Sequence, residues 1–484
     1  MCGFVGIVGA REAAGAVTLG LQALQHRGQE AAGVATLGAD LAPRVLKGLG
    51  LAEDVLSPAA LATLGGELAV GHVRYPTHGG SGIEHAQPLL AGGVALVHNG
   101  NLVNSAELVK RYSLTEIGPW SDSSRLVAAI ASTLSDDPTL PELVASVGQV
   151  LDGLRGSYSA ALALTVAGRP TLVALRDRYG LRPACFGQRA DGAWVIASES
   201  AALDALGVRA WEHVPLGSLV ALVAGQAPVV VPLQPPSPAP CLFERVYFAR
   251  ADSVLEDGRV HSTREALGRA LAAVFRERGH AVDVVMPVPE TARPAATAFA
   301  AALGLPLREG FVKNRYARRT FILPDAPTRS RALQLKLNAL PETFPGQRIA
   351  LVDDSLVRGS TLARLAAAAR SAGAADLHVA IAAPPVLHPC FYGIDMPDPD
   401  ELIATRFGVD ELETKLAEWL GATSVTFLPA PRLPATLGSP RCDACFTGIY
   451  PIPICADERH EQQRERPSRQ TAGRIHAPGP HPIA

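Results

Sequence analysis

Short apolar runs separated by glycine-containing turns dominate the first half of the chain. The runs are four to seven residues long, which is typical of strands rather than helices, and they cover residues 68–73, 94–97, 160–166, 172–175, 193–197 and 218–223. Residues 14–24 and 123–134 are predicted to form helices. The pattern therefore predicts a domain built from sheets with a few helices.

Strands and helices alternate in the second half. The predicted order is helix 263–278, strand 282–286, helix 293–303, strand 349–352, helix 360–371 and strand 377–382. This alternation is typical of a parallel sheet whose strands are joined by crossover helices. The two halves are therefore expected to fold differently.

A proline-rich connector marks the boundary between them. Residues 229–240 read Val-Val-Val-Pro-Leu-Gln-Pro-Pro-Ser-Pro-Ala-Pro, so a strand ends and a linker begins there. A chain of 484 residues is long enough for two or three domains, and we expect domains at 2–235 and 241–455. Residues 456–484 contain little apolar material, which predicts a disordered tail.

Composition and charge exclude some classes of protein. Apolar residues make up 48% and charged residues 19%, as in an ordinary globular protein. A net charge of −2 gives no electrostatic reason to expect binding to nucleic acid or to a membrane surface. No signal peptide and no membrane-spanning apolar run is visible, so we expect a cytoplasmic protein with reduced thiols.

The second residue is a cysteine, and its position is the first indication of chemistry. Removal of Met1 would leave Cys2 with a thiol and a free α-amino group on one residue. Such an N-terminal nucleophile uses its own amine as the general base. Because Cys2 follows Met1 directly, no cleavable propeptide is expected.

Polar residues beside later apolar runs complete the requirements of a thioester-forming amidase. Asn99 and the Gly100 amide are expected to hold the oxyanion. Arg74 is expected to grip the substrate carboxylate, and Asp122 to face its α-ammonium. With Cys2, this set resembles the class II, N-terminal-nucleophile glutamine amidotransferases, which pass ammonia from glutamine to a second site.

The second half contains a candidate phosphate and cation site. The apolar strand 349–352 runs into Asp353 and Asp354, and a short loop with Gly359 leads into a helix. Amides at a helix N-terminus favour a phosphate, and paired carboxylates suit ribose hydroxyls and Mg²⁺. The stretch resembles the phosphoribosyl diphosphate (PRPP) site of type I phosphoribosyltransferases.

That resemblance implies a set of site residues. Thr291, Asp353 and Asp354 are the implied Mg²⁺ ligands. The implied PRPP-binding residues are Asp353, Asp354, Ser355, Arg358, Gly359, Ser360, Thr361, Lys313 and Tyr316.

The combination of the two sites resembles the amidophosphoribosyltransferase family over about residues 2–455. The resemblance implies a two-domain α/β and α+β protein: an N-terminal αββα sandwich and a C-terminal phosphoribosyltransferase parallel sheet. It implies that glutamine, PRPP and water give phosphoribosylamine, diphosphate and glutamate, the first committed step of purine synthesis. It also implies Mg²⁺, feedback inhibition by purine nucleotides, and a homo-oligomer, either a tetramer or a dimer.

Four of the seven cysteines match the iron–sulfur branch of this family. Cys442 and Cys445 have the C-x₂-C spacing that suits chelation, although the pair alone is ambiguous. Cys241 and Cys390 are the other matching positions. The resemblance favours a [4Fe–4S] cluster, whereas four thiolates by themselves also suit zinc.

The chain departs from the family in the loop that closes over PRPP. Arg318, Ala326 and Gln334 replace the expected Gly, Gln and Arg. These changes leave open a regulatory homologue that senses PRPP or nucleotides. A class II amidotransferase with a sugar-isomerase or ATP-pyrophosphatase domain is the other alternative, and residues 349–361 argue against it. The intact Cys2 set favours an active enzyme.

Overall fold

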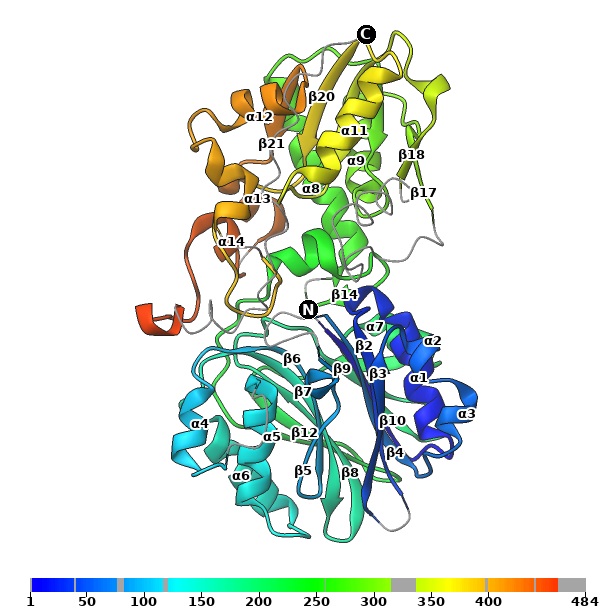
Figure 1. Cartoon of the computed structure of the whole chain (residues 1–484), viewed down its shortest axis with the longest axis vertical. Helices are drawn as coiled ribbons and strands as arrows, with labels where there is room; N and C mark the ends of the chain where they lie inside the picture. Colours follow the sequence, from blue (N-terminus) through cyan, green and yellow to red (C-terminus); the bar gives the residue numbers. More distant parts are fainter. Residues whose placement is uncertain are drawn as a thin grey trace.

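The computed structural model describes residues 2–38, 41–75, 82–115, 121–256, 258–314, 337–396, 399–438 and 441–459. The chain forms two lobes, one from each half of the sequence, which lie end to end in Figure 1.

Two antiparallel sheets form the first lobe. In spatial order, the first sheet contains β11 (Ala210–His213), β9 (Cys185–Gln188), β10 (Trp194–Ala197), β1 (Gly3–Val8), β4 (Leu68–Arg74), β2 (Ala31–Leu37) and β3 (Pro43–Leu49). The second contains β13 (Val229–Pro232), β12 (Ser218–Val223), β8 (Arg169–Arg176), β7 (Gly156–Val166), β6 (Val94–Leu102) and β5 (Leu89–Ala91).

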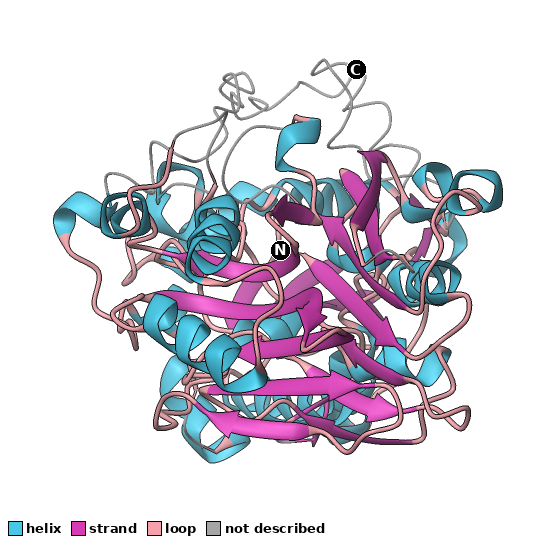
Figure 2. Cartoon of the chain, turned by 90° about the horizontal axis from the view of Figure 1, so that it is seen from below, coloured by secondary structure: helices cyan, strands magenta, loops and turns pink. Residues whose placement is uncertain are grey.

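Helices cover the outer face of each sheet, which produces four layers (Figures 1 and 2). The first sheet is covered by α1 (Ala13–Ala23), α2 (Ala52–Val55), α3 (Pro58–Leu61) and α7 (Ser200–Ala205), near the short η1 (Gln25–Arg27). The second is covered by α4 (Ala106–Arg111), α5 (Asp122–Thr133) and α6 (Leu140–Leu151), and η2 (Ile83–His85) precedes β5. Phe4, Val70, Val97 and Leu172 pack between the sheets. The predicted αββα sandwich is confirmed.

A parallel sheet forms the second lobe, in the order β16 (Val284–Pro287), β19 (Arg348–Asp353), β20 (Asp376–Ile381) and β21 (Ser424–Phe427). The helices α8 (Val260–Glu277) and α9 (Arg293–Leu303) cover one face, and α11 (Ser360–Ser371) and α12 (Leu412–Leu420) cover the other. The helix predicted at 263–278 begins at residue 260 in the structure. The strand predicted at 282–286 lies at 284–287.

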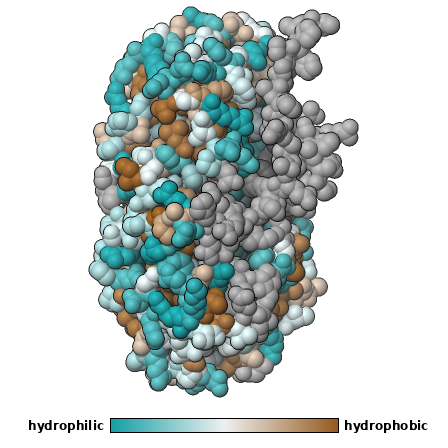
Figure 3. Space-filling model, turned by 60° about the vertical axis from the view of Figure 1, so that its left-hand side comes forward, coloured by the Kyte–Doolittle hydropathy of each residue, from teal (hydrophilic) through white to brown (hydrophobic). Residues whose placement is uncertain are grey.

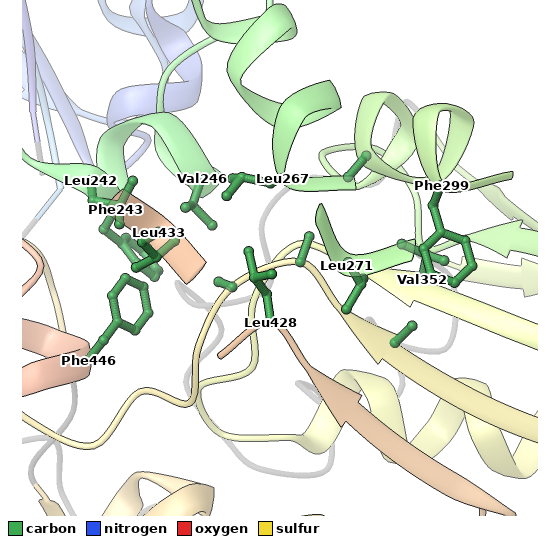
Figure 4. Packing of buried hydrophobic residues seen from close by; sticks show 14 of the residues in the cluster. Leu242, Phe243, Val246, Leu267, Leu271, Phe299, Val352, Leu428, Leu433 and Phe446 are labelled. Atoms are coloured by element: carbon green, nitrogen blue, oxygen red, sulfur yellow. The ribbon is translucent and has the colours of Figure 1, made fainter. Parts of the chain in front are cut away.

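Alternation along β19 explains why this sheet is buried on both faces. Ala350 and Val352 pack toward α8 and α9, whereas Ile349 and Leu351 pack toward α11 and α12. Figure 4 follows the first of these cores from Phe299 and Val352 to Phe243 and Phe446. The core beneath the sheet is thus continuous with the segments that carry the candidate ligand cysteines.

Smaller elements complete this lobe. They are the π-helical η3 (Glu244–Phe248), the hairpin of β14 (Val254–Leu255) and β15 (Gly258–Arg259), the hairpin of β17 (Phe311–Lys313) and β18 (Leu337–Ala339), η5 (Pro341–Thr343), η6 (Pro399–Glu401), η7 (Ile403–Arg406), η8 (Ala430–Arg432), α13 (Leu433–Leu437) and α14 (Ala444–Thr447).

The predicted disorder from residue 456 is wrong for the first residues of that segment. Residues 456–459 form a helical turn. The Glu458 carboxylate is buried, forms an ion pair with Arg155 of the first lobe, and accepts a hydrogen bond from the Cys455 amide at 2.9 Å. Composition could not show this, because the cation that orders Glu458 lies about 300 residues earlier in the chain. The rest of the predicted tail lies outside the described residues.

Where Figure 3 colours the surface by hydropathy, polar side chains are interspersed with apolar ones. Within the described ranges, no helix is long and apolar enough to cross a membrane.

Candidate active sites

Cys2 lies directly before β1, a central strand of the first sheet, and is half-buried. Its Sγ is 3.6 Å from the Tyr75 carbonyl oxygen, to which it donates. Its own carbonyl accepts a hydrogen bond of 2.8 Å from Arg27 Nε. Gly3 makes this approach possible, because a Cβ there would lie 3.1 Å from Arg27 Cδ. The thiol therefore lies at the start of β1, and the buried Arg27 guanidinium fixes the position of the Cys2 backbone.

Asn99 and Gly100 lie on β6 of the opposite sheet, and a serine connects Asn99 to β1. Asn99 Nδ2 donates to Ser198 Oγ at 2.7 Å, and the same hydroxyl accepts from the Phe4 amide at 2.8 Å. Gly100 has φ +139°, and a Cβ there would lie 2.1 Å from the Ser157 carbonyl oxygen, so only glycine fits. The two predicted oxyanion donors are thereby fixed on rigid strands.

Arg74 and Asp122 are both buried at element ends. Arg74 ends β4, and its Nη1 is 2.5 Å from Glu30 Oε2. Asp122 begins α5, where its Oδ2 accepts from the Leu102 amide of β6 at 3.1 Å. This bond connects Asp122 to the strand that carries Asn99.

The histidines near these residues are neutral. Burial lowers the pKa of His72 to about 3, and burial also lowers the pKa of His98. His98 Nδ1 lies 2.8 Å from Ser123 Oγ, beside Asp122. Because neither imidazole carries a charge near neutral pH, Arg74 is the charged partner expected to bind the substrate carboxylate.

The structure reveals buried charges that the sequence analysis did not assign. Arg27 forms ion pairs with Glu199 and Glu244, and Arg182 binds Glu244 at 2.9 Å. All four side chains are almost completely excluded from solvent. Charged residues are rarely buried unless they are paired, and a sequence alone does not show which charges will meet.

The candidate PRPP loops leave neighbouring strands at the same edge of the parallel sheet. Pro287 of β16 pairs with Val352 of β19, and the Val288 amide donates to the Val352 carbonyl at 2.8 Å. The loop with Thr291 therefore begins beside the turn with Asp353. This arrangement follows from the parallel pairing of the two strands.

The paired carboxylates are electrostatically strained. Burial raises the pKa of Asp354 from 3.8 to about 6, and burial together with the Asp354 charge raises the pKa of Asp353 well above 3.8. Asp354 Oδ1 accepts from Ser355 Oγ at 2.6 Å, and the Asp354 amide donates to Asp353 Oδ1 at 2.9 Å. Like charges held this closely favour a shared cation.

Gly359 turns the chain into α11. Its φ is +77°, and a Cβ would lie 3.1 Å from the Trp419 ring, so glycine is required. Ser360 and Thr361 then begin a helix of 12 residues, whose first amides and dipole favour a phosphate.

The remaining predicted PRPP-binding residues are Arg358, Lys313 and Tyr316. Arg358 lies in the same loop, but its guanidinium forms an ion pair with Glu401 at 2.9 Å. Lys313 ends β17 and is half-buried. Tyr316 lies outside the described residues, as do Arg318, Ala326 and Gln334 of the same loop.

The four candidate ligand cysteines come together at the junction of the lobes. Cys241 forms an isolated bridge with Cys442, whose amide donates to the Pro240 carbonyl at 2.9 Å. Burial raises the pKa of Cys445, and the neighbouring Cys241, Cys390 and Cys442 thiols raise it further. The four thiols are therefore close enough to interact, although they come from segments about 200 residues apart.

In the parts of the chain that the structure describes, no group of three or more His, Cys, Asp or Glu side chains is placed so that it could hold a metal ion.

The two lobes and their sites define a glutamine amidotransferase domain joined to a phosphoribosyltransferase-type sheet. Residues 81–205 match the family model described as a glutamine amidotransferase domain. The amidophosphoribosyltransferase of Mycobacterium tuberculosis is 40% identical over 469 residues, covering 94% of this chain and 86% of that protein. The chain belongs to the amidophosphoribosyltransferase family.

Further relatives extend this similarity. The amidophosphoribosyltransferase of Methanothermobacter thermautotrophicus is 37% identical, covering 94% of this chain and 95% of that protein. The structure of glutamine PRPP amidotransferase from B. subtilis, complexed with ADP and GMP, superposes with a TM-score of 0.82 at 36% identity, covering 94% and 98% of the two chains. The family and the fold predicted from the sequence are confirmed, and the regulatory alternative is not favoured.

Proposed function

We propose that the enzyme converts glutamine, PRPP and water to 5-phosphoribosylamine, diphosphate and glutamate, the first committed step of purine nucleotide synthesis. The observation that carries the proposal is that one chain of this family holds both sets of chemistry-bearing residues. Cys2 directly precedes β1, which is connected through Ser198 to Asn99 of β6. Asp353 and Asp354 lie at the carboxyl end of β19 in the parallel sheet.

In the first half-reaction, the Cys2 thiolate attacks the amide carbonyl of glutamine. A C–S bond forms, and the oxyanion is held by Asn99 Nδ2 and the Gly100 amide. Arg74 binds the substrate carboxylate and Asp122 its ammonium. Collapse of the tetrahedral intermediate breaks the C–N bond, and ammonia leaves with a proton relayed by the Cys2 α-amine. Water then hydrolyses the thioester to glutamate and regenerates the thiol.

In the second half-reaction, ammonia attacks C1 of PRPP and displaces diphosphate. Thr291, Asp353 and Asp354 are proposed to hold Mg²⁺, and the strained charge of the two aspartates supports this. When bound, Mg²⁺ would neutralise charge on the diphosphate. The 5-phosphate binds at the start of α11, with Ser355, Arg358, Gly359, Ser360 and Thr361 around it.

The remaining PRPP contacts come from the segment after β17. Lys313 and Tyr316 are proposed to bind PRPP there. Ammonia is expected to travel internally, because free ammonia is protonated at pH 7 and then lacks a nucleophilic lone pair.

Cys241, Cys390, Cys442 and Cys445 are proposed to hold a [4Fe–4S] cluster. Their mutual proximity and the burial of Cys241, Cys442 and Cys445 support this, as does the buried Arg182, which lies near Cys241 and Cys390 and would balance negative charge. Such a cluster is proposed to be structural and to take no part in the chemistry.

The domain bounds, the regulation, the cellular location and the oligomeric state are proposed on the same basis. The domains are 2–235 and 241–455. Purine nucleotides act as feedback inhibitors, which the ADP and GMP named for the B. subtilis structure support. The enzyme works in the cytoplasm as a homo-oligomer, either a dimer or a tetramer.

The proposal is tested by measuring glutamate release from glutamine with and without PRPP and Mg²⁺, on anaerobically purified protein. PRPP-dependent release with an equal amount of diphosphate is expected. Release that is indifferent to PRPP would contradict coupling of the two sites, and no release at all would contradict the glutaminase.

A further inference from the structure

One buried hydroxyl connects the strand of the nucleophile to a proposed oxyanion donor on the opposite sheet. Ser198 directly follows β10, and both Ser198 and Asn99 of β6 are excluded from solvent. Asn99 Nδ2 donates to Ser198 Oγ at 2.7 Å, and the Phe4 amide of β1 donates to the same oxygen at 2.8 Å. Phe4 lies two residues after Cys2. A single side chain therefore fixes Asn99 relative to the strand that follows the thiol.

The Ser198 hydroxyl is itself held in place by β1. A hydroxyl offers one proton and two lone pairs. The two N–H donors occupy the lone pairs, and the proton is directed at the Phe4 carbonyl oxygen, 3.4 Å away. The Ser198 amide also donates to that carbonyl, at 3.0 Å. Asn99 is thus bonded to a fixed point on the first sheet.

The other end of the Asn99 carboxamide is not held in this way. Among the described residues, its buried Oδ1 has no hydrogen-bond partner. The terminal torsion of an Asn side chain has a broad range, so a hydrogen bond must select one orientation. Because the carboxamide is planar, fixing one Nδ2 hydrogen on Ser198 also fixes the direction of the other. That second hydrogen is the one left to bind an oxyanion.

We propose that Ser198 is a positioning residue for the glutaminase reaction, which orients the Asn99 carboxamide so that its free N–H faces the developing oxyanion. Without the hydroxyl the carboxamide is free to turn, and the partial negative charge of Oδ1 is then able to face the oxyanion instead. Donors of this kind stabilise a transition state only when they are oriented before the charge develops. This inference rests on the proposed function, because it takes Asn99 as an oxyanion donor.

The test compares Ser198→Ala with the matched control Ser200→Ala. Ser200 is as deeply buried as Ser198, and its Oγ accepts from the Val254 amide at 2.9 Å. Each variant therefore leaves one backbone amide without its acceptor, and the Tm of both should fall by similar amounts. Of the two serines, Ser198 is the one that is bonded to Asn99. A difference in catalysis between the variants consequently reports the orientation of Asn99 rather than damage to the fold.

Ser198→Ala should lower the glutaminase kcat about 10- to 100-fold, somewhat less than outright loss of an oxyanion donor. The KM for glutamine should stay within about twofold of the wild type, because Arg74 and Asp122 are left to bind the substrate. Ammonia-dependent synthesis and alkylation of Cys2 by iodoacetamide should also stay within about twofold, since neither uses the oxyanion site. Ser200→Ala should match the wild type in all four measurements.

A second variant covers the case in which Ser198→Ala does not fold. Ser198→Cys keeps the site filled, but a thiol is a weak donor and acceptor. It should show the same fall in kcat at an unchanged KM for glutamine.

A double-mutant cycle with Asn99→Ala assigns the effect. When Asn99 is already alanine, Ser198→Ala should lower kcat by less than about twofold, because Ser198 acts through that side chain. Independent, multiplicative effects would overturn the inference. An equal loss of kcat in Ser200→Ala, or a wild-type kcat in Ser198→Ala, would also overturn it. Failure of the proposed function looks different: the wild type would release no glutamate, or Asn99→Ala would keep the wild-type kcat.

Discussion

Asp353 and Asp354 show how a single pair of side chains sets the behaviour of a site. Both pKa values are raised, mainly by burial, and that of Asp354 reaches about 6. A carboxyl group whose pKa rises on folding favours its protonated form in the fold. Its contribution to stability is therefore present below the unfolded pKa of 3.8 and is lost as the pH rises through about 6.

The variant Asp353→Asn should consequently be more stable than the wild type at pH 7.5 without Mg²⁺, by about 1–2 kcal/mol, because it removes one of two like charges. The decline of wild-type Tm between pH 4 and pH 6.5 should flatten in the variant. The measurement is Tm against pH in EDTA. Asp204→Asn changes an exposed carboxylate on α7 and should follow the wild-type curve. An Asp353→Asn protein that is less stable than wild type at pH 7.5 would show that the pair is not strained.

Cys2 is the other residue whose role can be isolated. Cys2→Ala should abolish glutamine-dependent synthesis, because no thioester can form. Synthesis from high ammonia at alkaline pH should persist near the wild-type rate, since that half-reaction uses only the second lobe. The measurement is phosphoribosylamine formation from each nitrogen source. Loss of both activities together would show that the two half-reactions are not divided between the lobes as proposed.

At the scale of elements, the loop of residues 391–393 connects the second lobe to strands β6 and β7 of the first lobe by hydrogen bonds. The Phe391 carbonyl accepts from Asn101 Nδ2 of β6 at 2.8 Å, and the Tyr392 carbonyl accepts from Ser157 Oγ of β7 at 2.6 Å. Gly393 approaches closest: a Cβ there would lie 2.7 Å from the Gly100 carbonyl oxygen. The strand that carries the proposed oxyanion donors is thus contacted by the residues that directly follow Cys390.

Gly393→Ala should therefore destabilise the enzyme and lower its glutamine-dependent kcat, because a methyl group would displace Gly100. Gly408→Ala is the matched control, since Gly408 also has a positive φ, of +72°, but has open space where its Cβ would lie. Both variants carry the backbone cost of about 1–2 kcal/mol, and Gly393→Ala should lose about 2 kcal/mol more. Denaturant unfolding measures the loss of stability, and glutaminase assays measure the fall in kcat. Equal losses in the two variants would argue against the close approach.

At the scale of the whole molecule, the four gathered cysteines come from distant parts of the chain. Cys241 begins the second lobe, Cys390 lies between β20 and β21 of the parallel sheet, and Cys442 and Cys445 come near the end of the lobe. A group held by all four would close long loops, and closing long loops removes entropy from the unfolded chain. Its effect should be on the integrity of the whole protein rather than on one step of the chemistry.

Cys241→Ser should accordingly lose bound iron and acid-labile sulfide, and should unfold at a markedly lower temperature than the wild type. Cys455→Ser removes an exposed thiol and should keep both the metal and the stability. Metal analysis and the visible spectrum of anaerobically purified protein distinguish the cases. Stoichiometric zinc without sulfide in the wild type would refute the iron–sulfur assignment.

Much of the fold followed from local pattern. The strand at 218–223 and the helix at 293–303 were predicted with their observed bounds, because alternation, helical periodicity and glycine turns act over short distances. Site residues such as Asp353 were recognisable because a strand runs directly into them. Boundaries such as the start of α8 were less accurate, because Val260, three residues before the predicted start at residue 263, is buried and begins the helix.

The sequence by itself determined the order of the elements, the chemistry-bearing side chains and the family, since these depend on residue types at short spacings. Only the tertiary structure decided that Arg27 and Glu244, 217 residues apart in the chain, meet in the buried interior. It also decided that Glu458 is buried against Arg155 and that four scattered thiols converge. Contacts of this kind depend on how two lobes pack together. Packing is set by the combined burial of many side chains, which no local stretch of sequence displays.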